Sequence, residues 1–361
     1  MPKGSKLSGF YAMSDYFIPH SRPSVAGSDI KAVSSVLESG QIAQGPSVDE
    51  FEKQFSDFIG KKETAATSSG TAALHLALLA LGVKGGDEVI VPSFVCTAVL
   101  NAVLYTGATP VVADIDPGTY NISVDAVRGA ITQKTKAVIV PHMFGCPAEI
   151  DELLKLGIPV IEDCAQSVGA HYKGQKVGSF GVLSVFSFYA TKVFTTGEGG
   201  MVVSDSEDLI ARVKDLREYD NKDEYALRFN YKMTDIHAAL GLNQLSHLEK
   251  FLDRRRMIAD SYFEEFKDCD LSLPARKEGR EHIYYRFVAQ TEGDASVYLE
   301  KSQKNNVMCQ RPVYIPLHIC LTLPGFPKTM EAWKKTISIP LYPSLTEEEI
   351  EKIIAVVKKI F

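Results

Sequence analysis

The stretch EVIVPSFVCTAVLNAVLYTGATPVVAD, residues 88–114, contains two short apolar runs with a helical pattern between them. The runs at 88–92 and 110–114 are almost continuously apolar and rich in β-branched residues, as is typical of strands covered on both faces. Residues 97–105 predict a helix. A strand, a helix and a second strand in this order predict a parallel βαβ unit.

The same alternation continues on both sides of this unit. Strands are predicted at 137–141, 159–163, 182–188 and 200–204, and helices at 71–81, 123–131 and 148–156. Ahead of them lie a tail, residues 1–20, and a helical segment at 28–59 with a turn near 40–46. We therefore predict an α/β domain with a mostly parallel sheet that spans, with an N-terminal arm, residues 1–250.

The last third of the chain has a different pattern. From Thr234 it is helical to about Phe266, and the stretch 278–293, which contains an apolar run at 283–288, then predicts a strand. Two further helices are predicted at 296–306 and 346–359, the second opened by a capping box of Thr346 and Glu349. We predict a smaller α+β domain at residues 251–361.

Composition excludes few classes of protein but is typical of an ordinary globular protein. The chain has 361 residues, 45% of them hydrophobic, and 39 basic against 45 acidic side chains, so its net charge is −6. This balance gives no bulk electrostatic reason to bind nucleic acid or membranes. No apolar run approaches the roughly 20 residues of a membrane span. The polar N-terminus leads into no apolar segment, so we expect no signal peptide and a cytoplasmic location.

The six cysteines and eight histidines are scattered along the chain. None of the cysteines forms a CxxC pair, and the histidines form no HExxH motif. We expect free thiols in a reducing compartment and no metal site.

Three short segments could carry chemistry. Ser69-Gly70-Thr71 opens an apolar helix, where free N–H groups suit a phosphate, although a plain capped helix is the commoner explanation of such a segment. Asp163 ends an apolar strand and could hold a cation, or could simply cap a turn. Lys192 follows another strand, where a desolvated amine can form imines, although most lysines are surface charges. Together they are the parts that pyridoxal phosphate needs: a phosphate anchor, a carboxylate for the ring nitrogen and an amine for the aldehyde.

With these segments in view, the sequence resembles the DegT/DnrJ/EryC/StrS family of pyridoxal-phosphate-dependent nucleotide-sugar aminotransferases, within the fold-type I or aspartate aminotransferase superfamily. The matching segments occur in the family's order, at residues 39–46, 51–52, 69–74, 162–166, 187–192, 197–200, 230–233, 238–239, 244–245, 316–318 and 339–343. The resemblance covers almost the whole chain. It implies a large domain whose mostly parallel sheet lies between helices, and a small C-terminal α+β domain.

The resemblance also implies roles for individual residues. Lys192 matches the lysine that forms the Schiff base with the cofactor, Asp163 the partner of the pyridine nitrogen, and Gln166 a residue beside the cofactor's phenolic oxygen. Cofactor contacts are further implied for Ser69, Gly70, Thr71, Ser187 and, from the neighbouring subunit of a homodimer, Asn230. Cys96 falls where the family often has an aromatic residue stacked on the ring. Lys232, Tyr314 and His318 match the substrate side.

The implied reaction moves an amino group, by family analogy from L-glutamate, to a nucleotide-linked keto-sugar, as in the biosynthesis of amino sugars for polysaccharides. One alternative is a sugar dehydratase or deoxygenase on the same cofactor, but such relatives carry histidine at the position of Lys192. Another is a non-catalytic, cofactor-binding regulatory protein on the same fold. A dinucleotide oxidoreductase would need a GxGxxG motif after its first strand, and this sequence has none.

Overall fold

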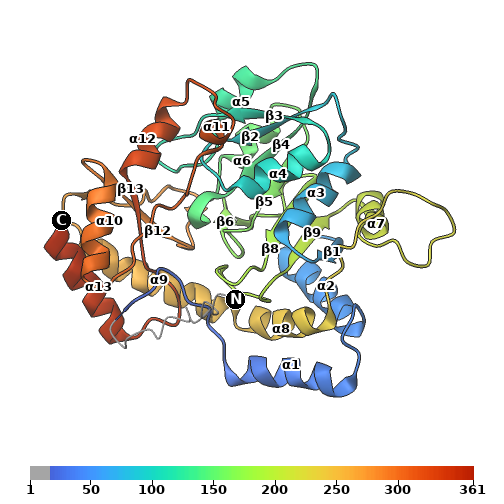
Figure 1. The fold of residues 1–361 in the computed structure, drawn as a ribbon, viewed down its shortest axis with the longest axis horizontal. Helices are drawn as coiled ribbons and strands as arrows, with labels where there is room; N and C mark the ends of the chain where they lie inside the picture. The colour runs from blue at the N-terminus through green and yellow to red at the C-terminus, as the bar shows by residue number, and fades with distance from the viewer. Residues whose placement is uncertain (1–16) are drawn as a thin grey trace, which may run out of the picture.

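A computed structural model describes residues 17–361 of the chain. At its centre is a seven-stranded sheet in the order β1-β9-β8-β5-β4-β2-β3 (Figure 1). The strands are β1 (Glu63–Thr67), β2 (Glu88–Pro92), β3 (Thr109–Ala113), β4 (Thr135–Pro141), β5 (Val160–Asp163), β8 (Leu183–Ser187) and β9 (Gly200–Ser204). Only β9 runs antiparallel to its neighbours, which confirms the predicted α/β class.

Helices cover both faces of this sheet. One face packs against α3 (Gly70–Ala80), α4 (Thr97–Tyr105) and α7 (Glu207–Leu216). The other packs against α2 (Pro46–Ile59), α5 (Val124–Ala130), α6 (Ile150–Leu154) and α8 (Asp235–Ser246). Within β2, Val89 and Val91 belong to the first core and Ile90 to the second. Successive side chains of a strand point to opposite faces, so two apolar faces require the continuous apolar runs seen in the sequence.

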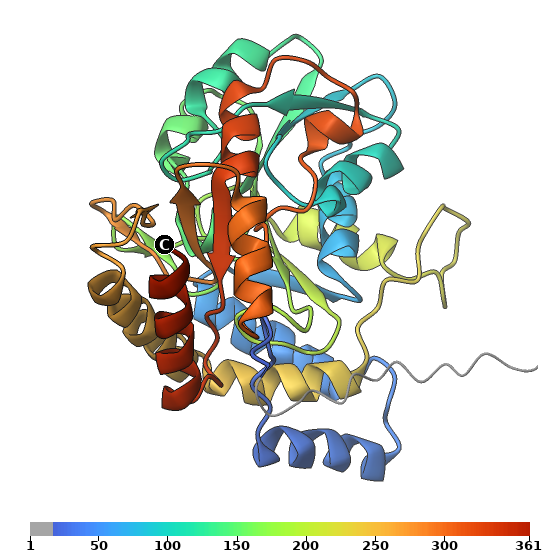
Figure 2. The same ribbon diagram turned by 60° about the vertical axis from the view of Figure 1, so that its left-hand side comes forward.

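A second, antiparallel sheet of three strands lies in the C-terminal part (Figure 2). Its strands are β10 (Leu271–Ser272), β12 (Phe287–Thr291) and β13 (Thr336–Ile339). Its helices are α9 (Leu248–Glu265), α10 (Ala295–Lys304), α12 (Pro327–Lys335) and α13 (Glu347–Ile360). The division at residue 250 remains a prediction. It falls within α9, whose Leu252 packs in the large-sheet core while Tyr262 packs in the small one.

The remaining elements are short or peripheral. They are α1 (Gly27–Ser39), the 3-10 turn η1 (Met143–Gly145), α11 (Leu317–Cys320) and a small sheet of β6 (His171–Tyr172), β7 (Gln175–Lys176) and β11 (Arg280–Glu281). Among residues 17–361, no helix combines the length and the apolarity that crossing a bilayer requires.

Several local predictions were wrong. The single strand expected at 278–293 is two strands, β11 and β12, because Tyr284 takes a left-handed conformation with φ of 49° that interrupts the extended run. Residues 1–16 of the expected tail lie outside the described residues, and Ile18 is not part of a loose tail, since it is 2% exposed and pairs with Val307. Strands β1 and β13 and helices α7 and α12 were not predicted.

Candidate active site

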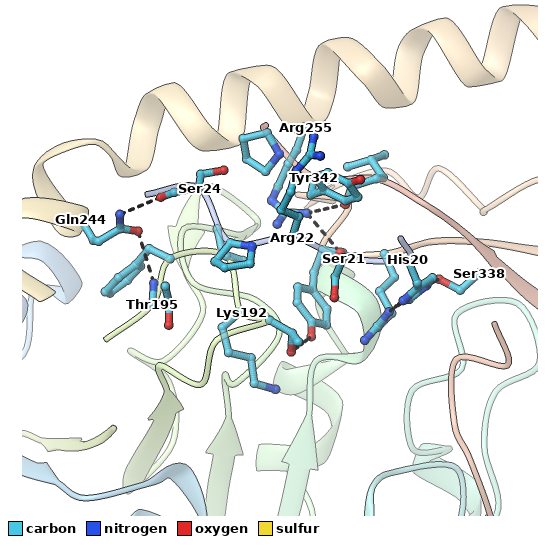
Figure 3. Close-up of a pocket in the computed structure, with 18 of the residues that line it drawn as sticks. His20, Ser21, Arg22, Ser24, Lys192, Thr195, Gln244, Arg255, Ser338 and Tyr342 are labelled. Carbon is cyan, nitrogen blue, oxygen red and sulfur yellow. Dashed lines mark hydrogen bonds between the residues drawn. The ribbon is translucent and has the colours of Figure 1, made fainter. Parts of the chain in front are cut away.

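The site lies where parallel strands of the large sheet end side by side. Strands β2, β5 and β8 run in one direction, so the segments that follow them meet at one edge of the sheet. Asp163 ends β5, and Cys96 and Lys192 lie in the segments that follow β2 and β8. The charge of Lys192 acts on the other two groups, so the three side chains lie near one another at this edge. Figure 3 shows the Lys192 side chain beyond the ends of the strands.

Asp163, the last residue of β5, is only 7% exposed. Its Oδ1 accepts a hydrogen bond from the N–H of Ala165 at 3.0 Å, while Oδ2 has no hydrogen-bond donor within residues 17–361. Burial raises the pKa of Asp163, although that N–H and the charge of Lys192 counteract it. A buried carboxylate with one oxygen unpartnered is suited to a cationic ring nitrogen, so this position fits the pyridine of pyridoxal phosphate.

Lys192 lies in the loop after β8, held by a hydrogen bond from its backbone N–H to the Tyr189 carbonyl at 2.9 Å. Its Nζ lies 5.5 Å from the centroid of the Tyr285 ring. The hydroxyl of Tyr285 is 3.4 Å from Oγ1 of Thr191. The aromatic ring therefore forms one wall of the cavity into which the amine projects.

The start of α3 provides the phosphate-binding geometry. Ser69 caps the helix by accepting the N–H of Ala72 at 3.1 Å. The N–H groups of Gly70 and Thr71 have no acceptor within the described chain. A side chain at Gly70 would place its Cβ 2.7 Å from Cβ of Ser187. Only glycine allows this approach, which brings the Ser187 hydroxyl beside the free N–H groups and makes an anion site that fits the cofactor's phosphate.

A larger cleft opens beside this edge, with a volume of about 1150 Å³. Cys96, Gln166 and Tyr314 all line it. Gln166 accepts the N–H of Phe144 through Oε1 at 2.9 Å. Cys96 is exposed in this concave surface. Desolvation raises the pKa of its thiol, and the positive charge of Lys192 lowers it by a smaller amount. The Tyr314 side chain is 87% exposed.

Three residues implied by the resemblance do not join the cavity within one chain. His318 is 4% exposed, and its Nδ1 lies 2.6 Å from Oγ of Ser93, which gives it a packing role. Lys232 pairs with Asp220 at 2.9 Å. Asn230 is exposed at the end of the segment that follows α7, and this segment projects from the body of the molecule (Figures 1 and 2). Its contact with a neighbouring subunit remains a prediction.

The sequence reasoning missed a set of charged and aromatic residues around Lys192. The small cavity that it enters is also lined by His20, Arg255, Tyr285 and Arg286. Residues 283–288 had been interpreted as a strand and His20 as part of a tail. The signal in the sequence was Arg286, a charged residue inside an apolar run. A charged side chain is rarely buried unless it binds a partner or a ligand.

Tyr285 is 5% exposed and lies among three cations. Burial alone would raise the pKa of this phenol. The positive charges of Lys192, Arg286 and Arg255 outweigh burial and lower the pKa to about 8. The cavity is therefore strongly attractive to negative charge.

One buried cluster resembles a metal site by composition. Ligand atoms of His142, Glu162 and Cys164 lie within 4.8 Å of one another. The Glu162 carboxylate already accepts hydrogen bonds from Gly178, Phe180, Gly181, Ser184 and His142. Nδ1 of His142 accepts the N–H of Ala148 at 3.0 Å. With these atoms engaged, the cluster is explained as a structural hydrogen-bond network.

Comparison with known proteins agrees with this geometry. Residues 23–358 match the model of the DegT/DnrJ/EryC1/StrS aminotransferase family. The chain is 36% identical to a GDP-perosamine synthase of Escherichia coli O157:H7, with 92% of this chain and 96% of that protein covered. It is 35% identical to the spore coat polysaccharide biosynthesis protein SpsC of Bacillus subtilis (strain 168), with 96% and 97% covered. The putative sugar aminotransferase Spr1654 of Streptococcus pneumoniae, solved in its PLP form, superposes with a TM-score of 0.90 at 30% identity, covering 96% of this chain and 98% of that one.

Proposed function

The chain belongs to the DegT/DnrJ/EryC1/StrS aminotransferase family and is a pyridoxal-phosphate-dependent sugar aminotransferase; from this premise we propose that it moves the amino group of L-glutamate to the ketone of a nucleotide-linked sugar. The observation that carries the proposal is the position of Lys192 and of the buried carboxylate of Asp163 at the ends of two adjacent parallel strands, β8 and β5. A histidine in place of Lys192 would favour deoxygenation instead.

The residues of this site divide the work. Pyridoxal phosphate, when bound, supplies an aldehyde carbon that accepts amines and a ring that takes up electron density. Asp163 would keep a proton on the ring nitrogen, and the Ser187 hydroxyl with the N–H groups of Gly70 and Thr71 would hold the phosphate. Nζ of Lys192 would first hold the aldehyde. Once displaced by the donor, it would take a proton from the donor's α-carbon.

The acceptor is inferred from the size of the cleft and from the relatives. The 1150 Å³ cleft beside Lys192 exceeds what an amino acid needs and suits a sugar joined to a nucleotide. The relatives named as GDP-perosamine synthase support the same class of substrate. We assign no particular sugar.

The assembly and location are also part of the proposal. We infer a homodimer with shared active sites, because Asn230, at the base of the projecting segment, is exposed and lines neither cavity of its own chain's site. That segment also exposes large apolar side chains, with Tyr225 97% and Leu227 72% exposed. We place the enzyme in the cytoplasm, since all six of its cysteines are unpaired.

The direct test is a screen of nucleotide-linked keto-sugars with L-glutamate, in which mass spectrometry detects an amine in place of the ketone. Lys192→Ala should abolish this product, while Lys84→Ala, at an exposed lysine in a turn, should not reduce it. Borohydride should attach the cofactor to Lys192 in the wild-type protein. Wild-type turnover by Lys192→Ala would refute the assignment.

A further inference from the structure

Arg286 lies at the junction of the site's cavities. It lines the small cavity that Lys192 enters and also the 1150 Å³ cleft that contains Cys96 and Gln166. Its guanidinium carbon lies 5.1 Å from the centroid of the Tyr285 ring, and Nζ of Lys192 lies 5.5 Å from the same centroid. The two cations therefore flank one aromatic ring, and both are accessible from the place where a substrate would react.

The charge of Arg286 is not neutralised by the surrounding protein. Nη1 donates to Nδ1 of His20 at 2.6 Å, and Nε2 of the same ring lies 2.8 Å from Oγ of Ser338. Burial, and then the charge of Arg286, hold the pKa of His20 well below its ordinary value, so the ring is neutral near pH 7. Within residues 17–361, Arg286 forms no ion pair with a carboxylate, and Nη2 and Nε have no protein acceptor.

The other arginines that line these cavities are already engaged. Arg22 pairs with Glu349 at 2.8 Å, and Arg311 with Asp294 at 2.9 Å. Arg255 is 3% exposed and donates through Nη1 to backbone carbonyls. Arg255 also lacks a carboxylate partner, and its Nε has no acceptor in the described chain, but its side chain is enclosed. Arg286 is therefore the more accessible guanidinium whose charge is unpaired and whose Nη2 and Nε remain for a ligand. A guanidinium held in this way recognises a planar pair of oxygens.

We propose that Arg286 binds a carboxylate of the amino donor and of the 2-oxo acid that it becomes. This inference rests on the proposed function and names the residue that selects the donor. In an α-amino acid the α-carboxylate carbon is two bonds from the reacting nitrogen, so an anion site close to Lys192 suits it. The diphosphate of a nucleotide sugar is separated from the ketone by part of the sugar ring, so it would lie deeper in the large cleft.

The test measures binding to the holoenzyme without turnover. Glutarate, a dicarboxylate with neither amine nor ketone, is titrated by calorimetry into wild type, Arg286→Gln, Arg286→Lys and Arg128→Gln. Arg128 is an exposed arginine on α5 that pairs with Asp125, and serves as the matched control. We expect Arg286→Gln to weaken glutarate binding by about 10- to 100-fold, Arg286→Lys to restore part of it, and Arg128→Gln to leave it unchanged.

A second titration, with GDP, separates the two sources of anionic oxygen. The proposal expects GDP binding to change less than about threefold in Arg286→Gln, since one lost charge-assisted contact weakens binding by more. Loss of GDP binding with glutarate binding intact would overturn it, as would unchanged binding of both. Retention of the holoenzyme's cofactor absorbance shows that a variant is folded. If wild type binds glutarate through Arg286 but transfers no amine, the proposed function fails, and Arg286 keeps its role as a carboxylate-binding residue without an assigned donor.

Discussion

The amine of Lys192 lies 5.5 Å from the centre of the Tyr285 ring, and Arg286 and Arg255 also face that ring. These cations lower the pKa of a buried phenol, so the tyrosine reports the electrostatics of the cavity.

Tyr285→Phe should change how the stability of the apoprotein depends on pH. The pKa is about 8 in the folded chain against an ordinary value of 10.0, so the folded state releases its proton first. Deprotonation therefore adds stability as the pH rises from 8 towards 10, by about 2 to 3 kcal/mol, and adds none below pH 8. Denaturant unfolding of wild type and Tyr285→Phe across this range measures the difference. Tyr225→Phe, at an exposed position, should preserve the wild-type dependence; a difference that does not grow with pH would contradict the prediction.

Asp163→Asn should slow amino transfer without preventing cofactor binding. The amide keeps the shape of the carboxylate but removes the charge opposite the ring nitrogen. An opposite charge at this range shifts a pKa by about 1 to 3 units, which predicts about a 10- to 1000-fold loss in rate. Stopped-flow measurement of the half-reaction with L-glutamate gives the rate. Asp205→Asn, which affects a surface pair with Lys61, is the control; equal rates in the two variants would remove Asp163 from the mechanism.

Gly70→Ala should loosen the phosphate anchor. The added methyl would lie 2.7 Å from Cβ of Ser187, so the start of α3 and the end of β8 must separate. We expect a loss of about 1 to 3 kcal/mol in stability and faster loss of cofactor on dialysis. Gly27→Ala, also at the first position of a helix but with no atom within 4 Å of the added carbon, should behave as wild type. Undiminished cofactor retention in Gly70→Ala would count against this anchor.

Glu162→Gln should destabilise the fold. Burial would raise the pKa of Glu162, but the hydrogen bond from His142 and the N–H groups of Gly181 and Gly178 outweigh it, so the pKa lies below its ordinary value of 4.5. The NH₂ group of the glutamine would face these donors without an acceptor, which should lower the free energy of unfolding by about 2 to 5 kcal/mol. The advantage of wild type is present above pH 4.5 and is lost as the pH falls below it. Urea unfolding at pH 7 and in acid, with the exposed Glu152→Gln as reference, tests both parts.

Mixing two defective proteins should restore activity if active sites are shared. A heterodimer of Lys192→Ala and Asn230→Ala contains one site with both native residues when Asn230 reaches the partner's cavity. Random exchange of subunits should then recover up to about a quarter of wild-type activity at limiting cofactor. If Asn230 served its own chain, each site would lack one residue and mixing would restore nothing.

The alternating apolar runs were enough to predict the large sheet and most of the helices that cover it, because strands covered on both faces must be apolar along almost their whole length. Strand β1, with the sequence ETAAT, was not predicted, because its small residues give only a weak hydrophobic pattern. Its position in the sheet depends on pairing with β9. Asp163 and Lys192 were predicted as site residues from their positions at and after strand ends. Tyr285 and Arg286 were not, since the left-handed Tyr284 that turns them into the cavity cannot be identified from local sequence.

The sequence by itself determined the α/β class and led to the proposal of Asp163 and Lys192 as the two central site residues, since hydrophobic periodicity and strand-end polar residues are local properties. Only the tertiary structure decided what surrounds Lys192. Tyr285, Arg286 and Arg255 come from the C-terminal part, and His20 from the N-terminal segment. Their electrostatic effect depends on distances between groups far apart in the chain, and these distances exist only after folding.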